Sequence, residues 1–313
     1  MAHEYFESAP HFRPYRWAAP AFQIGLQPIK PCHWLLVDHD YENFMCAKRS
    51  RLLLSPARLY KTLPASLAAQ RELRRAVVTH LIEDHAALFS QSDAILTCTA
   101  STRSWDLNDE SMEPLWQLSD FVQEDLMLLE EIDGRQTITA ASNAYSSSGR
   151  LVASVGQDVR WAHQPVPNLT MLHGPRIDRV LASVHQDVLC ARFNWQLTPI
   201  GSIFFPPDPH AANHAALKSV SARLAKDPSL APSLLHVRVE RQTLRRLPET
   251  RAVAFSIHTY SDPLYSLGTD LAACDALRTL LRSYPAERLQ YSEMDTVHVA
   301  VIAWLETLLT SSR

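Results

Sequence analysis

The stretch Arg238–Leu264, RVERQTLRRLPETRAVAFSIHTYSDPL, is predicted to form two β-strands joined by a turn, and it decides the fold class. Its second half alternates with the period of two that a half-buried strand has. The residues that share one face of this half are Val253, Phe255, Ile257 and Thr259. The turn LPET between the two halves predicts a hairpin.

The first strand carries many charges for a strand with a core face. Its arginines are Arg238, Arg241, Arg245 and Arg246. Arg241 has the same parity as Val237 and Val239, so its side chain is predicted to point toward the core. A buried guanidinium needs a partner that satisfies its charge and its donors. The pattern therefore predicts a buried or half-buried anion beside this strand.

Composition limits the class of protein. The chain has 313 residues, 46% of them apolar, which is enough for one large core or two modest ones. The formal net charge of −3 argues against nucleic acid or an acidic membrane as the partner. No run reaches the roughly 18 apolar residues of a membrane helix, and the first residues have neither the basic n-region nor the apolar h-region of a signal peptide, so we expect none. Five scattered cysteines without a CxxC pair indicate reduced thiols, and we expect a cytoplasmic protein.

Glycine usage excludes several common sites. The chain has seven glycines and twenty prolines. The patterns GxGxxG, GxxxxGK[ST] and GxSxG do not occur. Phosphate-binding loops and nucleophile elbows depend on glycine at these positions, so nucleotide-binding and hydrolase functions are disfavoured.

Helical and strand periods divide the chain. Apolar residues at helical spacing predict helices over residues 66–89 and 113–131. Strands are predicted over 136–145, 150–156 and 188–197, in addition to the two strands of the hairpin. A proline-rich insert, 163–187, ends as a helix. A helix capped by Asp262 with Pro263 in its first position follows, and an amphipathic helix closes the chain.

This order predicts an α+β fold with a mainly antiparallel, five-stranded sheet. The insert is a long helical crossover between the second and third strands, and helices flank the sheet at both ends of the chain. We expect an N-terminal extension with helices over 1–132, a sheet core over 133–262 and C-terminal helices over 263–313, together forming one compact unit.

One histidine has surroundings that suit a metal ligand. His163 lies in RWAHQPVP, where Pro165 and Pro167 restrict the backbone to extended conformations. A side chain on such a stiff segment is well held for ligating iron. The alternative is a loop histidine that bonds to a carbonyl oxygen.

Other polar residues favour structural interpretations. Two histidine pairs have no third metal ligand nearby in the sequence and are predicted to lie at the surface: His80 and His85, and His210 and His214. Glu124 and Asp125 are neighbours in a predicted helix, where adjacent side chains point about 100° apart and cannot share a proton. The strand RFNWQL places Asn194 on a polar face, which either lines a pocket or faces water.

Several of these motifs together resemble one family. The segments FQIGLQPIKPCHWLLVDHDY, QEDL, HQPVP, RFNW and RVERQTLRRLP…AFSIHTYSDPL occur in the order found in heme-dependent oxidative N-demethylases. The resemblance runs from about Arg13 to past Pro263. The string RVERQTLRRLP is highly specific, whereas QEDL alone is a weak signal.

The resemblance implies a PAS-like sheet that holds heme b, in a chain similar to the α subunit of dimethylamine monooxygenase. It implies His163 as the proximal iron ligand, and arginines that neutralise the heme carboxylates: Arg238, Arg241 and Arg245. Oxygen and a small amine then meet on the distal side, with Asn194 and His258 as the polar residues. Electrons come from flavin and iron–sulfur partner subunits, and a folate-binding partner captures formaldehyde.

The sequence departs from the family in one segment that we expect to lie near the pocket. SNAYSSSGRL stands where the family has a phenylalanine–proline–serine stretch ending in tryptophan, and Asn168 and Leu169 replace a glycine and an aromatic residue. Asn143 and Tyr145 lie in the altered segment. The difference leaves open whether the substrate is dimethylamine or another molecule. A heme or small-molecule sensor without turnover is the alternative function, and a scaffold subunit that has lost its heme is a third.

Overall fold

A computed structural model of the chain describes residues 12–16, 25–38, 40–145, 150–162, 174–204 and 209–311. These residues fall into two compact units. Unit 1 comprises Met1–Gly25, Phe193–Arg241 and Thr259–Arg313, and unit 2 comprises Leu26–Arg192 and Gln242–His258. The boundary falls inside three strands, so each of them contributes residues to both units. The chain is α+β with a large antiparallel sheet, as predicted.

Unit 2 contains the longer part of the chain. Its elements are β1 (Gln27–Pro28), α1 (Tyr41–Leu54), α2 (Pro56–Leu59), β2 (Tyr60–Thr62), α3 (Leu67–Asp84), β3 (Phe89–Ser92), β4 (Ile95–Cys98), β5 (Arg103–Asp106), α4 (Pro114–Phe121), β6 (Asp125–Ile132), β7 (Arg135–Ser142), α5 (Arg150–Ala153), α6 (Val159–Ala162) and α7 (Gly174–Ser183). Three strands pass from one unit into the other: β8 (Cys190–Thr198), β9 (His236–Arg246) and β10 (Val253–Pro263).

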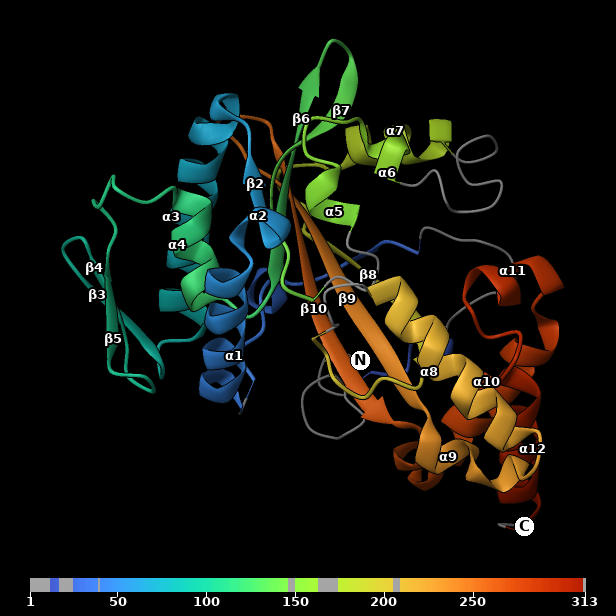
Figure 1. Cartoon of the computed structure of the whole chain (residues 1–313). Helices are drawn as coiled ribbons and strands as arrows, with labels where there is room; N and C mark the ends of the chain where they lie inside the picture. The colour runs from blue at the N-terminus through green and yellow to red at the C-terminus, as the bar shows by residue number, and fades with distance from the viewer. Residues whose placement is uncertain are drawn as a thin grey trace. The chain divides into compact units, whose positions relative to one another are not determined.

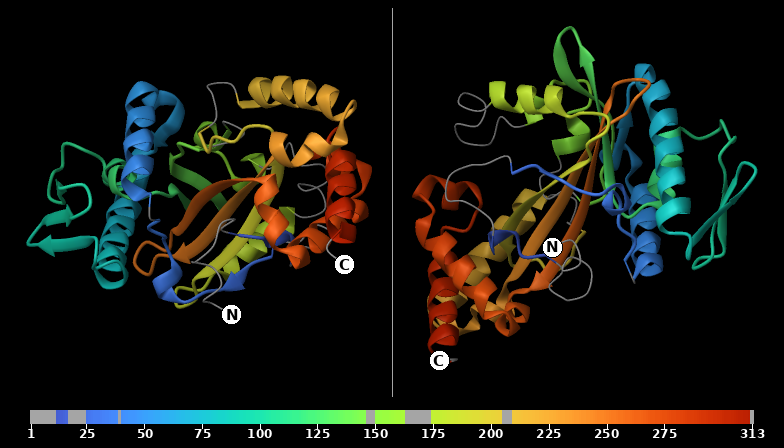
Figure 2. Two further views of the ribbon diagram at one scale, coloured as in Figure 1. Left: turned by 90° about the horizontal axis from the view of Figure 1, so that it is seen from below. Right: turned by 180° about the vertical axis from the view of Figure 1, so that it is seen from behind.

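Unit 1 is completed by helices. They are α8 (Pro209–Leu224), α9 (Ala231–Leu234), α10 (Leu271–Ser283), α11 (Ala286–Tyr291) and α12 (His298–Ser311). Both α10 and α12 belong to the C-terminal part of the chain and lie side by side (Figure 2). Val301 and Leu305 are fully buried on one stripe of α12, as its amphipathic pattern predicts.

The main sheet has seven strands in the order β1-β8-β9-β10-β6-β7-β2, and β3, β4 and β5 form a second, three-stranded sheet. The pairings of β1 with β8, β10 with β6, β6 with β7 and β7 with β2 are antiparallel. The expected count of five strands is therefore too low. Two of the additional strands, β1 and β2, are only two and three residues long, which is too short to show a period.

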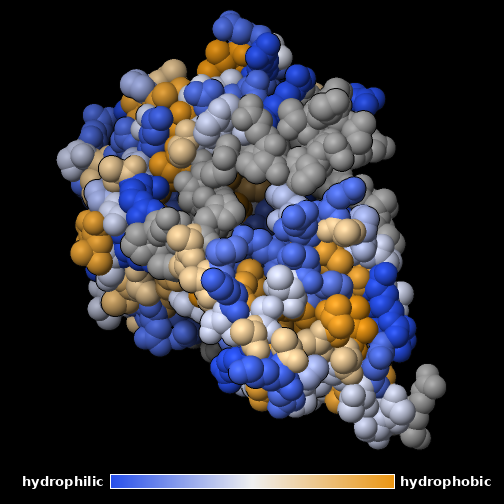
Figure 3. Space-filling view, turned by 45° about the vertical axis from the view of Figure 1, so that its right-hand side comes forward, coloured by the Kyte–Doolittle hydropathy of each residue, from blue (hydrophilic) through white to orange (hydrophobic). Residues whose placement is uncertain are grey.

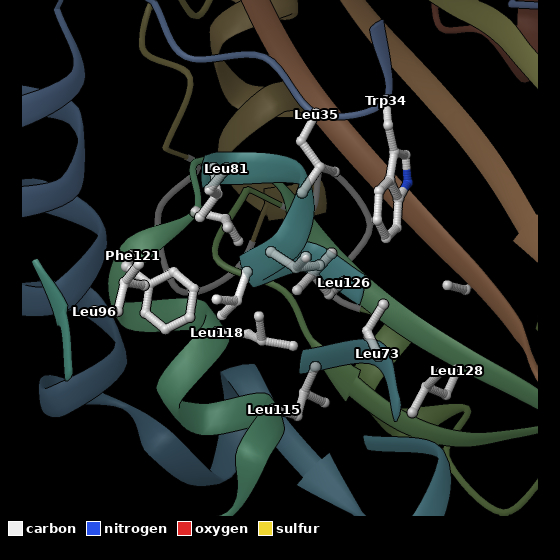
Figure 4. Packing of buried hydrophobic residues seen from close by; sticks show 14 of the residues in the cluster. Trp34, Leu35, Leu73, Leu81, Leu96, Leu115, Leu118, Phe121, Leu126 and Leu128 are labelled. Atoms are coloured by element: carbon white, nitrogen blue, oxygen red, sulfur yellow. The ribbon is translucent and has the colours of Figure 1, made fainter. Parts of the chain in front are cut away.

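The predicted helix over 113–131 is wrong in its second half, where the structure has β6. Leu126 and Leu128 pack into one hydrophobic cluster, whereas Met127 and Leu129 pack into another. Figure 4 shows Leu126 and Leu128 among side chains of α3 and α4. Because both faces of β6 are buried, its sequence is a continuous apolar run without the period of a half-buried strand.

The strand predicted over 150–156 is also wrong, because this segment begins with the short helix α5. Its end nevertheless pairs with β7 through main-chain hydrogen bonds. Gly156 N–H donates to Ile138 O at 2.8 Å, and Ile138 N–H donates to Gln157 O at 3.0 Å. Gly156 has a φ of 95°, a conformation that other residues rarely adopt.

Within unit 2, helices cover both faces of the sheet. Figure 1 shows α1, α3 and α4 on one side of β6 and β7, and α5, α6 and α7 on the other. The first side encloses the cluster that contains Leu73, Leu118 and Leu126, and the second encloses the cluster of Met127 and Ile138.

The predicted cap at Asp262 is a further correction. Asp262 and Pro263 are the last residues of β10, and a 3-10 helix, Leu264–Thr269, follows them. The helix α10 begins later, and Asp270 caps it by accepting a hydrogen bond from Ala273 N–H at 2.9 Å. Both aspartates precede an apolar run, so the sequence offers two possible caps.

Figure 3 shows a face on which hydrophilic and hydrophobic residues are mixed. Elsewhere in unit 2, Leu53 and Leu54 are neighbours at the end of α1 and are 72% and 83% exposed. Over the described ranges, none of the helices is both long enough and apolar enough to cross a bilayer.

Candidate functional site

A buried lysine fixes the chain where α4 ends and β6 begins. The ammonium group of Lys48 donates to the carbonyl oxygens of Val122 at 2.9 Å and of Glu124 at 2.5 Å, and it lies 3.4 Å from that of Gln123. Lys48 belongs to the buried stripe of α1: Tyr41, Met45, Lys48 and Leu52. It therefore occupies a position where the helical period calls for an apolar residue.

The environment of Lys48 lowers the pKa of its ammonium group to about 8. Burial is the main cause, because it penalises the charged form, and attraction to Asp125 and Glu124 offsets part of that penalty. The ammonium group is still mostly charged at pH 7. It therefore places a cation beneath the segment that carries these two carboxylates.

Glu124 connects this segment to two other parts of unit 2. Its Oε1 accepts a hydrogen bond from Leu36 N–H at 2.7 Å and lies 3.1 Å from His258 Nδ1. Ile257 pairs with Asp125 in the register of β10 and β6, so His258 and Glu124 are the next residues along the two strands. The other ring nitrogen, His258 Nε2, lies 2.9 Å from Asp38 Oδ2.

The two carboxylates determine the charge of His258. Burial alone disfavours the imidazolium, but attraction to Asp38 and Glu124 outweighs burial and raises the pKa of His258 to about 9. For Glu124, burial acts to raise the pKa, and attraction to His258 with the hydrogen bonds to Oε1 brings it below its usual value. At neutral pH this part of the molecule is an imidazolium held between two carboxylates.

Asp125 points away from this pair and orders the chain after β7. One carboxylate oxygen accepts from Asn143 Nδ2 at 2.8 Å and from Tyr145 N–H at 3.0 Å, and the other accepts from Ala144 N–H at 2.7 Å. Asn143 and Tyr145 belong to the segment where the sequence departs from the family pattern. The departure thus lies in direct contact with the QEDL motif.

Aromatic rings lie beside the ion cluster, which we define as Asp38, Lys48, Glu124, Asp125 and His258. The ring of the half-buried Phe44 is 4.9 Å from the ring of Tyr145 and 5.9 Å from that of His258. The ammonium group of Lys48 lies 5.7 Å from the Tyr145 ring centre. Burial, then the carboxylates of Asp125 and Glu124, raises the pKa of Tyr145 well above its usual value, so its hydroxyl stays protonated.

The predicted site residues differ in burial and in their hydrogen-bond partners, and one of them is not described by the structure. His163 lies outside the described residues. His258 is fully buried in unit 2 with both ring nitrogens facing carboxylates, so neither nitrogen is available to a ligand without breaking a contact. Asn194 is exposed in unit 1, and its Nδ2 lies 3.5 Å from Glu240 Oε2.

The arginines of β9 serve different purposes. Arg238, which is 1% exposed, donates to Ile203 O at 3.1 Å, and Arg241 is 4% exposed. The guanidinium of Arg245 stacks 4.2 Å from the ring centre of Trp34. Arg246 donates to three main-chain carbonyl oxygens. Since Arg238 and Arg241 have opposite parity and are both buried, parity does not single out one of them.

Sequence reasoning missed Lys48, Asp38 and the function of Glu124 in this cluster. It also placed His80 at the surface, which is wrong. His80 is 4% exposed, and its Nδ1 lies 2.8 Å from Asp84 Oδ2, while its Nε2 lies 3.2 Å from Leu35 N. The one available signal was Asp84 four residues after His80, at the spacing of an ion pair on a helix.

The fold and the cluster define an α+β protein in which three sequence motifs meet around buried charges. Asp38 comes from VDHDY, Glu124 and Asp125 come from QEDL, and His258 comes from AFSIHTY. Residues 25–302 match the family described as "Haem-dependent oxidative N-demethylase, alpha subunit-like". The chain belongs to this family. The family is heme-dependent, and its description as an alpha subunit implies partner subunits and a small-molecule substrate.

Proposed function

We propose that this chain is the heme b-bearing subunit of an oxygenase that removes a methyl group from a small amine, as dimethylamine monooxygenase does. The family match over residues 25–302 carries the proposal. The antiparallel sheet with helices packed on it supports a PAS-like arrangement of the heme-binding part. We assign the proximal ligand to His163, on the basis of the HQPVP motif.

The described residues fit the carboxylate side of a heme. Arg238 and Arg241 are buried guanidinium groups in the same unit and on one strand. Such groups bind carboxylates through paired, charge-assisted hydrogen bonds. We propose that the arginine-rich strand holds the heme carboxylates, with Arg241 as the best single candidate. Arg246 is excluded because carbonyl oxygens already accept from its Nε, Nη1 and Nη2.

A heme bound through one protein ligand supplies an iron with an open position for O2. In the overall reaction, an N-methyl amine, O2, two electrons and two protons give the demethylated amine, formaldehyde and water. The chain contributes the ligand, the charges and the placement of the substrate. We propose that flavin and iron–sulfur partner subunits deliver the electrons and that a folate-binding partner receives the formaldehyde.

An absorption spectrum tests heme binding by the whole chain. Wild type supplied with heme should give a Soret band, and His163→Ala should lose the band or shift it. His214→Ala is the matched control, because His214 is an exposed histidine that is predicted to lie at the surface. Full heme loading with an unchanged spectrum in His163→Ala would contradict the assignment and move the ligand to His173 or His185.

An activity assay tests turnover. Reduced, heme-loaded protein is given O2 and a panel of methylated amines, and formaldehyde is measured. Formaldehyde from at least one amine is the expected result. Protein that takes up O2 reversibly but yields no formaldehyde from any amine would contradict the enzyme and would favour a heme-based sensor.

A further inference from the structure

One atom of the ion cluster, Oε2 of Glu124, differs from the other polar atoms in its hydrogen bonding. Asp125 accepts three hydrogen bonds, both nitrogens of His258 face carboxylates, and Lys48 donates to carbonyl oxygens. Glu124 Oε2 is buried and has no hydrogen-bond partner among the residues that the structure describes. A buried carboxylate oxygen without a donor is costly, so this atom is suited to a donor supplied by a ligand.

The charges around this oxygen favour a cationic ligand. The cluster contains three carboxylates, Asp38, Glu124 and Asp125, and two cations, Lys48 and His258. Arg51 is a further cation nearby, and Asp125 is a carboxylate that attracts it. A positive charge placed at Oε2 would therefore meet a carboxylate whose other oxygen, Oε1, is paired with His258.

The aromatic rings favour the same kind of ligand. Phe44 and Tyr145 lie 4.9 Å apart, and Phe44 also contacts the ring of His258. Aromatic faces attract cations, including alkylated ammonium groups. The family description names N-demethylation, so a substrate of this family carries an N-methyl group. An aliphatic amine is protonated at neutral pH, as lysine is with a pKa of about 10.4.

We propose that Glu124 binds the ammonium nitrogen of the substrate through Oε2, with the rings of Phe44 and Tyr145 against its N-methyl groups. The substrate class in this inference rests on the proposed function, whereas the cation site itself does not. Asp38 and His258 are positioning residues, because they act on the ligand only through Glu124 Oε1. The chemical class of the ligand is a small methylated ammonium ion.

An alternative use of Glu124 is as a general base that takes a proton from the amine. A general base works best when its pKa is close to the operating pH. The pKa of Glu124 lies below its usual value because His258 and the donors at Oε1 stabilise the carboxylate. A group that stays ionised is a weak base and a good counter-ion, so recognition of a cation is the assignment that the geometry supports.

The test measures binding of trimethylammonium chloride to the purified full chain by calorimetry, with tert-butanol as a neutral ligand of similar size. Glu124→Gln should weaken trimethylammonium binding by about 10- to 100-fold and leave tert-butanol binding unchanged, because tert-butanol carries no charge to pair with the carboxylate. Glu130→Gln is the matched control. Glu130 lies on β6, the strand that begins directly after Glu124, and accepts a hydrogen bond from Thr139, so the variant should bind like wild type. Phe44→Leu should weaken binding of the cation by about 2- to 5-fold.

Equal trimethylammonium affinity in wild type and folded Glu124→Gln would overturn the inference, as would no binding to wild type. If Glu124→Gln does not fold, Phe44→Leu decides: an affinity unchanged from wild type overturns the inference. The heme spectrum of the same preparations separates this result from the proposed function. If the protein binds heme and is active but its trimethylammonium affinity does not depend on Glu124, only the proposed cation site is contradicted. If binding depends on Glu124 but the protein has neither heme nor turnover, only the proposed function is contradicted.

Discussion

Two buried cations of unit 2, Lys48 and Arg246, bind the same kind of hydrogen-bond acceptor but differ in the charged side chains near that acceptor. Each donates to main-chain carbonyl oxygens at the end of a helix. Lys48 does so just after α4, and Arg246 donates to Leu181 O at 2.5 Å and Val184 O at 2.7 Å at the end of α7. Cations are favourable there because the last carbonyl groups of a helix lack partners and carry partial negative charge.

The two cations differ in the side chains of the chain segments whose carbonyl groups they bind. The segment held by Lys48 presents Glu124 and Asp125, which continue the network to His258. The segment held by Arg246 ends α7 and leads to β8, and the third acceptor of Arg246 is Arg251 O at 2.6 Å. A buried arginine on a strand is therefore not in itself a sign of an anionic ligand. Part of the positive charge on β9 is explained by helix capping alone.

The largest expected effect is that of Lys48→Met. The substitution keeps the length of the side chain but leaves carbonyl oxygens and two carboxylates without their cation. We expect a loss of about 3–5 kcal/mol in the free energy of unfolding, the usual cost of removing one partner from a buried ionic network. Urea denaturation at pH 7 measures it. A loss below about 1 kcal/mol would show that the ammonium group does not hold this segment.

Arg246→Met should cost less, about 2–3 kcal/mol, because it removes hydrogen bonds to carbonyl oxygens but no close carboxylate pair. It should also leave trimethylammonium binding as in wild type, whereas Lys48→Met should weaken it. Denaturation and calorimetry on the same preparations measure both quantities. Loss of ligand binding in Arg246→Met would remove the distinction between the two cations.

The pH dependence of stability sharpens the comparison at His258. Its pKa of about 9 in the folded chain exceeds the unfolded value of about 6.5, so the stabilisation is complete below pH 6.5 and is lost as pH rises toward 9. Between pH 6.5 and pH 8 the loss should be about 1.5 kcal/mol. Lys48 acts in the opposite sense above pH 8, because its pKa is lowered, so the comparison stops there.

Urea denaturation of wild type and His258→Gln at these two pH values isolates the contribution of this residue. The variant should lose about 1.5 kcal/mol less than wild type over the interval. Equal losses in the two proteins would mean that His258 does not gain a proton on folding.

The smallest expected effect is that of Arg245→Met. Its guanidinium stacks on Trp34, a contact worth about 0.5–1 kcal/mol at a partly exposed site. If Arg245 also holds a heme carboxylate, the variant should bind heme more weakly than wild type. Titration with heme, followed by the Soret band, measures this. Unchanged heme affinity would limit Arg245 to the stacking contact.

Periodicity predicted the parts of the fold in which one face is buried and the chain segment is long. The hairpin of β9 and β10, the helix α3 and the helix α12 follow from it. It failed for β6, because burial of both faces replaces alternation by a continuous apolar run that a helix can also produce. It could not find β2, whose pairing is decided by distant partners rather than by its few residues.

The candidate site was less accessible to sequence reasoning than the fold. His258 was identified from the alternation of its strand, but its partners Glu124 and Asp38 lie 134 and 220 residues away in the chain. Glu124 and Asp125 were set aside on the assumption of a helix. At the start of a strand they point to opposite faces, one toward His258 and the other toward Asn143. Lys48 occupies an apolar position of a helix, where only tertiary structure reveals its purpose.

The most direct measurement is the pKa of His258, obtained by NMR of histidine-labelled protein across a pH titration. An imidazolium held between Asp38 and Glu124 should titrate with a pKa of about 9. The pKa should fall in Glu124→Gln, because one of the two carboxylates is lost, and should stay near 9 in Glu130→Gln. A wild-type pKa at or below about 6.5 would contradict the ion cluster on which both the positioning of Glu124 and its binding of a cation depend.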